Sequence, residues 1–379
     1  MRKTRRVLMA VHSDYLHDHR VRRETAALTQ AGYELEIIAA SPDVSLARCE
    51  EADGARVHFI PLQKKTGKAR YWEFVKRIRA KIAELRPADL IHAHDLDGLL
   101  ACAPASKKQH ARLIYDSHEL HTEVHSLQHR PLTRKLWALI ENRYIRQADA
   151  VITVSEGIAG VLQQRYKLAE RPVVVRNFTD PLPAPSGSDD SRMSLSLPPQ
   201  PYLALYQGVI QHGRGVDAML RAIAQTPDWG FVICGDGSQK AALEQLAAEL
   251  GITDRVRFTG MVSRDYILRI SRFCHAGFLL TEPLGLSHYY SLPNKLTEYI
   301  HYGLPVIATG LPEIRQIVEQ YGVGRIISAE QFASEEIARA LQELTNQDAG
   351  LKEGLKRASA DLTWSAEKER LLALYQKLI

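Results

Sequence analysis

Short apolar runs alternate with amphipathic helical patterns along almost the whole chain, and this alternation constrains the fold more than any other feature. Continuous apolar strands need cover on both faces, so strands separated by helices are typical of parallel, doubly wound sheets. In the first half the predicted strands are 6–11, 34–41, 57–62, 90–95, 111–117, 150–155 and 173–177. The helical patterns between them include 20–31, 69–85, 132–147 and 156–165. We therefore predict an α/β domain over residues 1–177.

Residues 178–200 interrupt the alternation with five prolines and no periodic pattern, which is typical of a linker. A second series then begins, with predicted strands at 202–208, 230–236, 256–260, 276–281 and 305–309. Its predicted helices are 214–225, 238–250, 293–302 and 312–320, and the tail from 334 is helical. The second domain is therefore expected over 201–363. Because ligands bind at the carboxyl ends of strands in such sheets, we expect a cleft between the two domains.

Composition excludes several other classes of protein. The 379 residues are 45% hydrophobic and 25% charged, which is typical of a globular chain and excludes wholesale disorder. The four cysteines lie far apart, which argues against a disulfide framework or a zinc ribbon and fits a reducing compartment. The first apolar run, Val7 to Val11, is too short for a secretory leader, and no run approaches the roughly 18 apolar residues of a spanning helix. We therefore expect a cytoplasmic protein that does not cross a membrane.

A glycine-rich turn follows the strand at 202–208. Gly208, Gly213 and Gly215 would let backbone N–H groups approach an anion, and Arg214 would add a positive charge at the start of the next helix. Taken alone, this pattern fits a glycine turn beside a solvated arginine equally well. A second turn, at Gly235 in GDGS, lacks the spacing of a dinucleotide fingerprint and is more typical of a tight turn.

A third turn lies within residues 281–313. Pro293 suits the first turn of a helix, with Asn294 and Lys295 at the helix start and Glu298 one turn later. Lys295 and Glu298 share a helix face, so they could meet a phosphate and a ribose diol respectively; the alternative is an ordinary helical ion pair. Three such turns at one sheet edge favour a phosphate-bearing ligand.

In this order and spacing the motifs resemble the retaining nucleotide-sugar glycosyltransferases of the glycogen-synthase-like group, family 4. The resemblance rests on GRGVDAML, GDGS, LGITDRVRFTGMV and PNKLTEYIHYGLPVIAT, and in the first half on IHAHD, IYDSHELHTEV and ADAVITVSEGIA. It covers nearly the whole chain. It implies the GT-B fold, an α/β architecture of two Rossmann-like doubly wound domains facing a cleft. In that fold a C-terminal helix, here at about 364–379, crosses back to the N-terminal domain.

The resemblance also implies roles for single residues. Arg214 matches the cation that binds the diphosphate, Glu298 the carboxylate that holds the ribose, and His118 the histidine that contacts the transferred sugar. The stretch from Gly260 to Val262 matches the backbone that reads the base. The further donor-side candidates are Gly208, Gly213, Gly215, Gly235, Glu282 and Asn294, and the acceptor-side candidates are Glu119 and Arg20.

The chain departs from the family pattern in three places. The family carries two glutamates eight residues apart, but Tyr290 stands eight residues before Glu298, and the nearest upstream acid is Glu282. The sequence HSDYLHDHR replaces the Gly-Gly turn after the first strand. Val209 stands where a second cation often follows the first turn, so Lys295 is expected to take that place. These departures concern the donor sugar rather than the fold.

Catalysis is expected to need no metal and no cofactor. Fixed cations and helix N-termini can stabilise a departing diphosphate, and His118, Arg214 and Lys295 are the catalytic candidates. The DxD-like pair of Asp95 and Asp97 is predicted to be a helix N-cap and a first-turn acid. His92 and His94 are expected on opposite sides of their strand, and so unable to bind one metal together.

The first half is strongly basic. Residues 1–177 hold 30 Lys and Arg against 21 Asp and Glu, whereas the remainder holds 19 against 23. The pattern at 69–85 is a basic amphipathic helix bearing Trp72, which fits either an ordinary packed helix or an anionic membrane surface. Residues 130–146 add five more cations. A lipid-linked acceptor is therefore expected, whereas nucleic acid is not, because the basic segments lack interleaved aromatic residues.

The combined prediction is a retaining, metal-independent glycosyltransferase. It would move a sugar from a nucleotide diphosphate sugar to a lipid-linked glycan in surface polysaccharide or glycolipid synthesis, peripheral on the inner face of the cytoplasmic membrane. The alternatives are an epimerase or hydrolase of sugar nucleotides on the same fold, a tRNA-directed glycosyltransferase, and a non-catalytic nucleotide-binding module. The sequence leaves UDP, GDP and ADP donors equally open.

Overall fold

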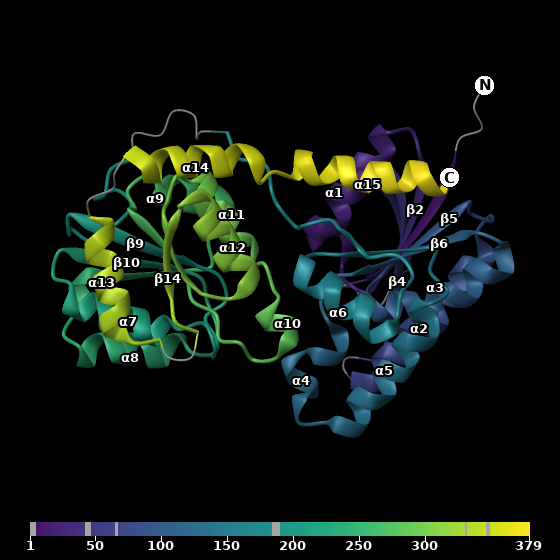
Figure 1. Cartoon of the computed structure of the whole chain (residues 1–379), viewed down its shortest axis with the longest axis horizontal. Coiled ribbons are helices and arrows are strands. Elements are labelled where there is room, and N and C mark those ends of the chain that lie inside the picture. The colour runs from purple at the N-terminus through teal and green to yellow at the C-terminus, as the bar shows by residue number, and fades with distance from the viewer. Residues whose placement is uncertain (1–4, 42–46, 65–66, 184–189, 330–331, 346–348) are drawn as a thin grey trace. The chain divides into compact units, whose positions relative to one another are not determined.

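The computed structural model describes residues 5–41, 47–64, 67–183, 190–329, 332–345 and 349–379 (Figure 1). The chain divides into two compact units. Unit 1 comprises Met1–Asn177, Gly285–Ser287 and Ser365–Ile379, and unit 2 comprises Phe178–Leu284 and His288–Trp364. The first unit is therefore completed by the last residues of the chain.

The segment predicted as a linker belongs largely to unit 2. Its residues 184–189 lie outside the described residues. After them, Leu195 and Leu197 are buried in the core of unit 2, and Arg269 Nε donates to Asp190 Oδ2 at 2.8 Å. Residues 190–200 thus pack as part of a folded unit, because their leucines have an apolar core to enter.

Unit 1 is built on an eight-stranded sheet with the order β3-β4-β2-β1-β5-β6-β7-β8. Its strands are β1 (Arg6–Val11), β2 (Glu34–Ser41), β3 (Arg48–Ala52), β4 (Ala55–Pro61), β5 (Leu90–His94), β6 (Arg112–Ser117), β7 (Ala150–Thr153) and β8 (Val173–Val174). Neighbouring strands pair in parallel, except that β3 runs antiparallel to β4. The polar edge strand β3 was not predicted, because RCEEA lacks an apolar run.

Helices cover both faces of this sheet. They are α1 (His19–Gln30), α2 (Gly67–Glu84), α3 (Asp95–Gln109), α4 (His125–Gln128), α5 (Pro131–Ile145), α6 (Glu156–Tyr166) and α15 (Trp364–Leu378). In Figure 1, α1 and the yellow α15 lie on one side of the strands, and α2, α3 and α5 lie on the other. Leu371 and Tyr375 of α15 are fully buried, so this terminal helix is part of the core of unit 1.

Unit 2 is built on a six-stranded, wholly parallel sheet with the order β11-β10-β9-β12-β13-β14. Its strands are β9 (Tyr202–Gln207), β10 (Trp229–Cys234), β11 (Val256–Gly260), β12 (Ala276–Leu279), β13 (Val306–Thr309) and β14 (Gly324–Ile327). The helices of this part of the chain are α7 (Val216–Gln225), α8 (Lys240–Glu249), α9 (Arg264–Ser271), α10 (Leu286–Tyr289), α11 (Asn294–His301), α12 (Pro312–Tyr321), α13 (Ser334–Leu344) and α14 (Ala349–Asp361).

Each sheet has a point where its strand order reverses. In unit 1 this point lies between β1 and β5, and in unit 2 it lies between β9 and β12. The loops leaving two such strands diverge to opposite faces, which opens a crevice at their carboxyl ends. The loops after β9 and β12 lie at this point in unit 2, and the loop after β5 lies at it in unit 1, with the loop after β6 on the neighbouring strand.

Across the ranges that the structure describes, no helix has both the length and the hydropathy needed to cross a bilayer.

Candidate active site

The loop after β9 brings Gly208 against the side chain of Lys295. Gly208 has φ +129°, and a Cβ at this position would lie 2.5 Å from Lys295 Nζ. Lys295 comes from the first turn of α11, whose N-cap is Pro293. A side chain at position 208 would therefore displace the ammonium group, so the glycine is required for this approach.

The glycines of the neighbouring turns are needed for packing. A Cβ on Gly235 would overlap the carbonyl oxygen of Gly208, and Gly235 forms an isolated bridge with Gly260. The structure thus places the turns after β9, β10 and β11 in contact with one another. Val262, two residues further along, packs against the core of unit 2.

The ammonium group of Lys295 lies against an aromatic ring. Its Nζ lies 4.4 Å from the ring centroid of Tyr206. Burial and the nearby positive charge of Arg214 lower the pKa of Lys295 to about 7, and Glu298 only partly opposes them. With its pKa near neutrality the amine can gain a proton when an anion binds nearby.

Glu298 does not form the helical ion pair with Lys295 that was considered as an alternative. Its Oε1 accepts from Arg264 Nη2 at 3.0 Å, and its Oε2 accepts from the side-chain amide of Gln207. Arg264 is the first residue of α9, and Gln207 is the last residue of β9. The carboxylate is thus held in one orientation from two sides.

The other donor-side candidates come from three segments of unit 2. Helix α7 begins at Val216 with Gly215 as its N-cap, two residues later than the predicted bounds of 214–225, so Arg214 lies just before the helix. The Glu282 N–H donates to the carbonyl oxygen of Gly213 at 3.0 Å, which places Glu282 beside this loop. Asn294 is the first residue of α11, next to Lys295.

His118 lies just after β6 in unit 1, between two carboxylates. Its Nδ1 is 3.4 Å from Asp95 Oδ2, and its Nε2 is 3.3 Å from Asp116 Oδ2. The backbone N–H of His118 also donates to Asp95 Oδ1 at 3.0 Å. Burial opposes protonation, but Asp95 and Asp116 outweigh it and raise the pKa of His118 to about 9. The ring is therefore an imidazolium at neutral pH, with a side chain that is 20% exposed.

Arg20, predicted on the acceptor side, is buried in unit 1 close to His118, and its guanidinium is occupied by internal partners. Nε and Nη2 of its guanidinium donate hydrogen bonds to the Asp116 carboxylate at 2.9–3.0 Å, and Nη1 donates to the Val175 carbonyl at 2.8 Å. Arg20 points inward because it lies on the buried face of α1. Arg20 and His118 overcome burial and hold the pKa of Asp116 well below its usual range. Glu119, by contrast, is exposed beside His118.

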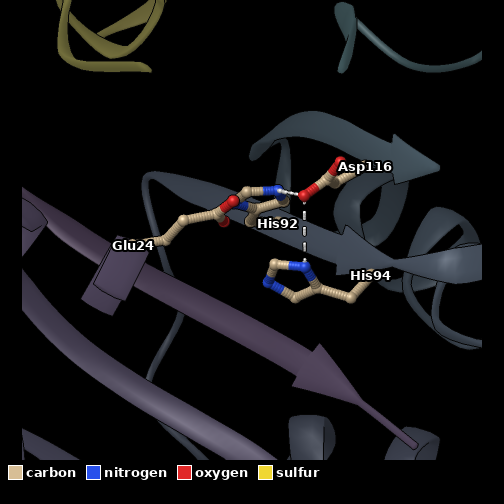
Figure 2. Close-up of side chains that lie close together, drawn as sticks. All are labelled: Glu24, His92, His94 and Asp116. Atoms are coloured by element: carbon tan, nitrogen blue, oxygen red, sulfur yellow. Dashed lines mark ion pairs between the residues drawn. The ribbon is translucent and has the colours of Figure 1, made fainter. Parts of the chain in front are cut away.

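Figure 2 shows four buried side chains that could hold a metal ion: Glu24, His92, His94 and Asp116. The prediction that His92 and His94 face opposite sides is wrong, because residues two apart in a strand point to the same face. Their rings stack with centroids 4.3 Å apart. Arg20 pairs with Glu24 Oε1 at 3.1 Å and with Asp116 Oδ2 at 2.9 Å, so a cation of the protein itself already faces both carboxylates of this group, and a metal ion would have to compete with it.

The DxD-like pair is also corrected. Asp95 is the first residue of α3 and has φ +57°, whereas the N-cap is His94. Asp95 therefore does not cap the helix, and its carboxylate holds His118 instead. Asp97 is a first-turn acid as predicted, and its Oδ2 lies 2.5 Å from His12 Nδ1.

Sequence reasoning missed Gln207 and Arg264, the partners of Glu298, and the role of Asp95 and Asp116 at His118. Gln207 carried a signal, since it is a polar residue that closes an otherwise apolar strand. Arg264 carried none, because it lies 34 residues from Glu298 and only the fold brings them together.

Comparisons with known proteins agree on one family. The profile described as "Glycosyltransferase Family 4" matches residues 19–181, and the profile described as "Glycosyl transferases group 1" matches residues 188–360. The chain is 28% identical to 2-deoxystreptamine glucosyltransferase of Streptomyces kanamyceticus over 76% of this chain and 75% of that protein. It is 30% identical to D-inositol 3-phosphate glycosyltransferase of Mycobacterium marinum over 52% of this chain and 42% of that protein.

Solved structures share the fold. Sucrose-phosphate synthase from Thermosynechococcus elongatus has a TM-score of 0.78 and 20% identity, covering 99% of each chain. HepE of Anabaena in complex with UDP and glucose has a TM-score of 0.75 and 17% identity, covering 98% of this chain and 100% of that one. Both sheets are Rossmann-like, and the fold is GT-B as predicted. The chain is a nucleotide-sugar-dependent glycosyltransferase and belongs to the group 1 glycosyltransferases.

Proposed function

We propose that the enzyme transfers its sugar with retention of configuration, without a metal, to a lipid-linked glycan held at an anionic membrane surface in surface polysaccharide or glycolipid synthesis. The observation that carries the acceptor assignment is an exposed apolar face on α5 of unit 1. The donor assignment rests on Arg214 and Lys295 at the loop after β9.

The apolar face of α5 consists of Leu132, Leu136 and Leu139, which are 84%, 52% and 59% exposed. These positions recur at helical spacing, so the three side chains share one side of the helix. Exposed Lys135 flanks them. Leucines beside cations are the composition of helices that lie in a lipid interface, where each cation adds about 1 kcal/mol near anionic lipid.

Helix α2, whose sequence pattern also fits a membrane surface, packs against α5 and buries most of its own apolar stripe. Its apolar stripe is core, with Val75, Ile78 and Ile82 buried, and only Trp72 is 51% exposed. Tyr71 packs on Trp137 of α5 with ring centroids 4.6 Å apart, which places the two helices together. The lipid surface is thus assigned to α5.

Fixed cations take the place of a metal in this proposal. Arg214 and the protonated form of Lys295 would stabilise charge on the departing diphosphate, each fixed donor contributing about 3 kcal/mol in a dry site. Glu298 is engaged by Gln207 and Arg264, which leaves it poorly suited to act as a nucleophile. Same-face attack assisted by the leaving phosphate is therefore favoured over double displacement.

The donor half is tested by thermal shift with UDP, GDP, ADP and their sugar conjugates, with and without magnesium. We expect a selective shift that is independent of magnesium, and a loss of turnover of at least about 100-fold in Arg214→Ala. Arg221→Ala, on the exposed side of α7, is the matched control. Donor consumption without an acceptor would indicate a hydrolase or epimerase, and binding without turnover would indicate a binding module.

The acceptor half is tested by co-sedimentation with vesicles containing phosphatidylglycerol and with neutral vesicles. We expect binding only to the anionic vesicles, and its loss in Leu132→Glu/Leu136→Glu. Met193→Glu, at an 88% exposed apolar residue of unit 2, is the control. Equal binding by the double variant, or transfer to a free cyclitol with no vesicle binding, would refute the lipid-surface assignment. Salt-dependent binding of tRNA would instead favour the tRNA-directed alternative.

A further inference from the structure

The side chain of Gln207 is fixed at the carboxyl end of β9, beside the point where the strand order of unit 2 reverses. The residue is only 5% exposed. Its backbone N–H donates to the Tyr299 hydroxyl at 3.0 Å, and its side-chain amide donates to Glu298. Two consecutive residues of α11 thus hold Gln207 by its backbone and by its side chain.

The orientation of the Gln207 amide follows from its partner. An ionised carboxylate can only accept hydrogen bonds, so the nitrogen Nε2 must face Glu298 Oε2. The oxygen Oε1 then occupies the other branch of the same planar group. Within the part of the chain that the structure describes, this buried oxygen has no hydrogen-bond donor.

A buried acceptor without a donor costs free energy, and such groups in native proteins call for an explanation. Here the explanation lies in what surrounds it. Gln207 is the last residue of β9 and its amide contacts the Glu298 carboxylate, at the sheet edge where ligands of such folds bind. The next residue is Gly208, whose backbone approaches the Lys295 side chain. A ligand with two neighbouring hydroxyl groups would give one donor to Glu298 and one to Gln207.

We propose that Gln207 is a specificity-determining residue that reads the ribose of the nucleotide donor together with Glu298. One ribose hydroxyl donates to the Glu298 carboxylate, and the other donates to Gln207 Oε1. The inference rests on the proposed donor site, and it adds a second contact by which the enzyme distinguishes ribonucleotides from deoxyribonucleotides. Arg264 holds the outer oxygen of Glu298 and leaves its remaining lone pairs for the sugar.

The test compares the full-length protein with Gln207→Leu, using the nucleoside diphosphate that binds and its 2′-deoxy and 3′-deoxy analogues. For the wild type, we expect one analogue to bind about tenfold more weakly than the ribonucleotide because of the lost bond to Gln207. For Gln207→Leu, the preference against that analogue should fall below about twofold, while the preference against the other analogue, which reports on Glu298, should remain.

Gln245→Leu is the matched control, since Gln245 makes the same kind of amide-to-carboxylate bond with Glu249 on the exposed side of α8, at 2.8 Å. Gln207→Asn, which keeps the amide but shortens the side chain, serves as a second variant and should lose the same preference. If both Gln207 variants bind nucleotide and keep both wild-type preferences, the inference is wrong while the donor site stands. If the wild type binds no nucleotide, the inference and the proposed donor site fall together.

Discussion

Donor binding should be coupled to uptake of a proton at Lys295. The free site has a lysine pKa of about 7, because burial and Arg214 disfavour the ammonium form. A bound diphosphate places two negative charges nearby and should return the pKa toward its ordinary value of about 10.4. Well below pH 7 the amine is charged before and after binding, so affinity should not change with pH. Well above pH 7 the free amine is mostly neutral, so binding must take up a proton, and affinity must fall as the pH rises.

The magnitude follows from the difference between the two pKa values. Between pH 7 and pH 8.5 the protonated fraction of the free amine falls from about one half to about 3%, so donor affinity should weaken roughly 15-fold. At pH 8.5 nearly one proton should be taken up for each donor bound. Isothermal titration calorimetry with a nucleotide diphosphate sugar, in buffers of different ionisation enthalpy, measures both quantities. The sugar diester is the right ligand, because a terminal phosphate titrates near pH 6 and would confuse the count.

Lys295→Arg is the control, since a guanidinium stays charged throughout this range and should make binding independent of pH. Equal affinity of the wild type at pH 7 and 8.5, with no proton uptake, would refute the reasoning. It would mean that the amine is already charged in the free site, or that it does not meet the diphosphate.

Three further outcomes are expected. Asp95→Asn should lower the pKa of His118 from about 9, while Oδ1 of the asparagine still accepts from the backbone N–H of His118. The alkaline limit of activity should therefore move to lower pH. An unchanged pH–rate profile and an unchanged histidine titration by NMR would contradict this. Gly208→Ala should destabilise unit 2 by about 1–3 kcal/mol in thermal unfolding, because alanine is strained at a φ of +129°. The new methyl group would also displace the Lys295 ammonium group, so donor binding should weaken in a titration. Tyr375→Phe should lower the free energy of unfolding by about 1 kcal/mol in urea, because it removes a buried hydrogen bond to His92; equal stability would show that this bond contributes nothing net.

The interior strands of both sheets were predictable because their sequences are uninterrupted apolar runs. Strand β2 has the predicted bounds, Glu34–Ser41, and seven of its eight residues are buried. The outer strands β3 and β14 were not predicted. They are short, their residues are mostly half-exposed or exposed, and their pairing depends on a neighbour rather than on their own pattern.

The candidate site was only partly predictable, because its chemistry depends on contacts between distant segments. The glycine turns and Lys295 follow from local spacing. His118 makes ion pairs with Asp95 and Asp116, which come from the ends of two adjacent strands. Glu298 accepts a hydrogen bond from Arg264, which comes from another helix. Helical periodicity also failed to separate the buried stripe of α2 from the exposed leucines of α5, since both show the same spacing and only tertiary packing distinguishes them.

The membership of α15 in unit 1 has a consequence for how the chain folds during synthesis. Unit 2 is inserted into unit 1, so a ribosome completes unit 2 when it reaches about residue 364, whereas unit 1 still lacks its last helix. Leu371 and Tyr375 then fill a face that has been open since residue 177 was made. We expect unit 2 to reach its native state first. Unit 1 should keep an exposed apolar surface, and depend most on chaperones, until α15 has been made.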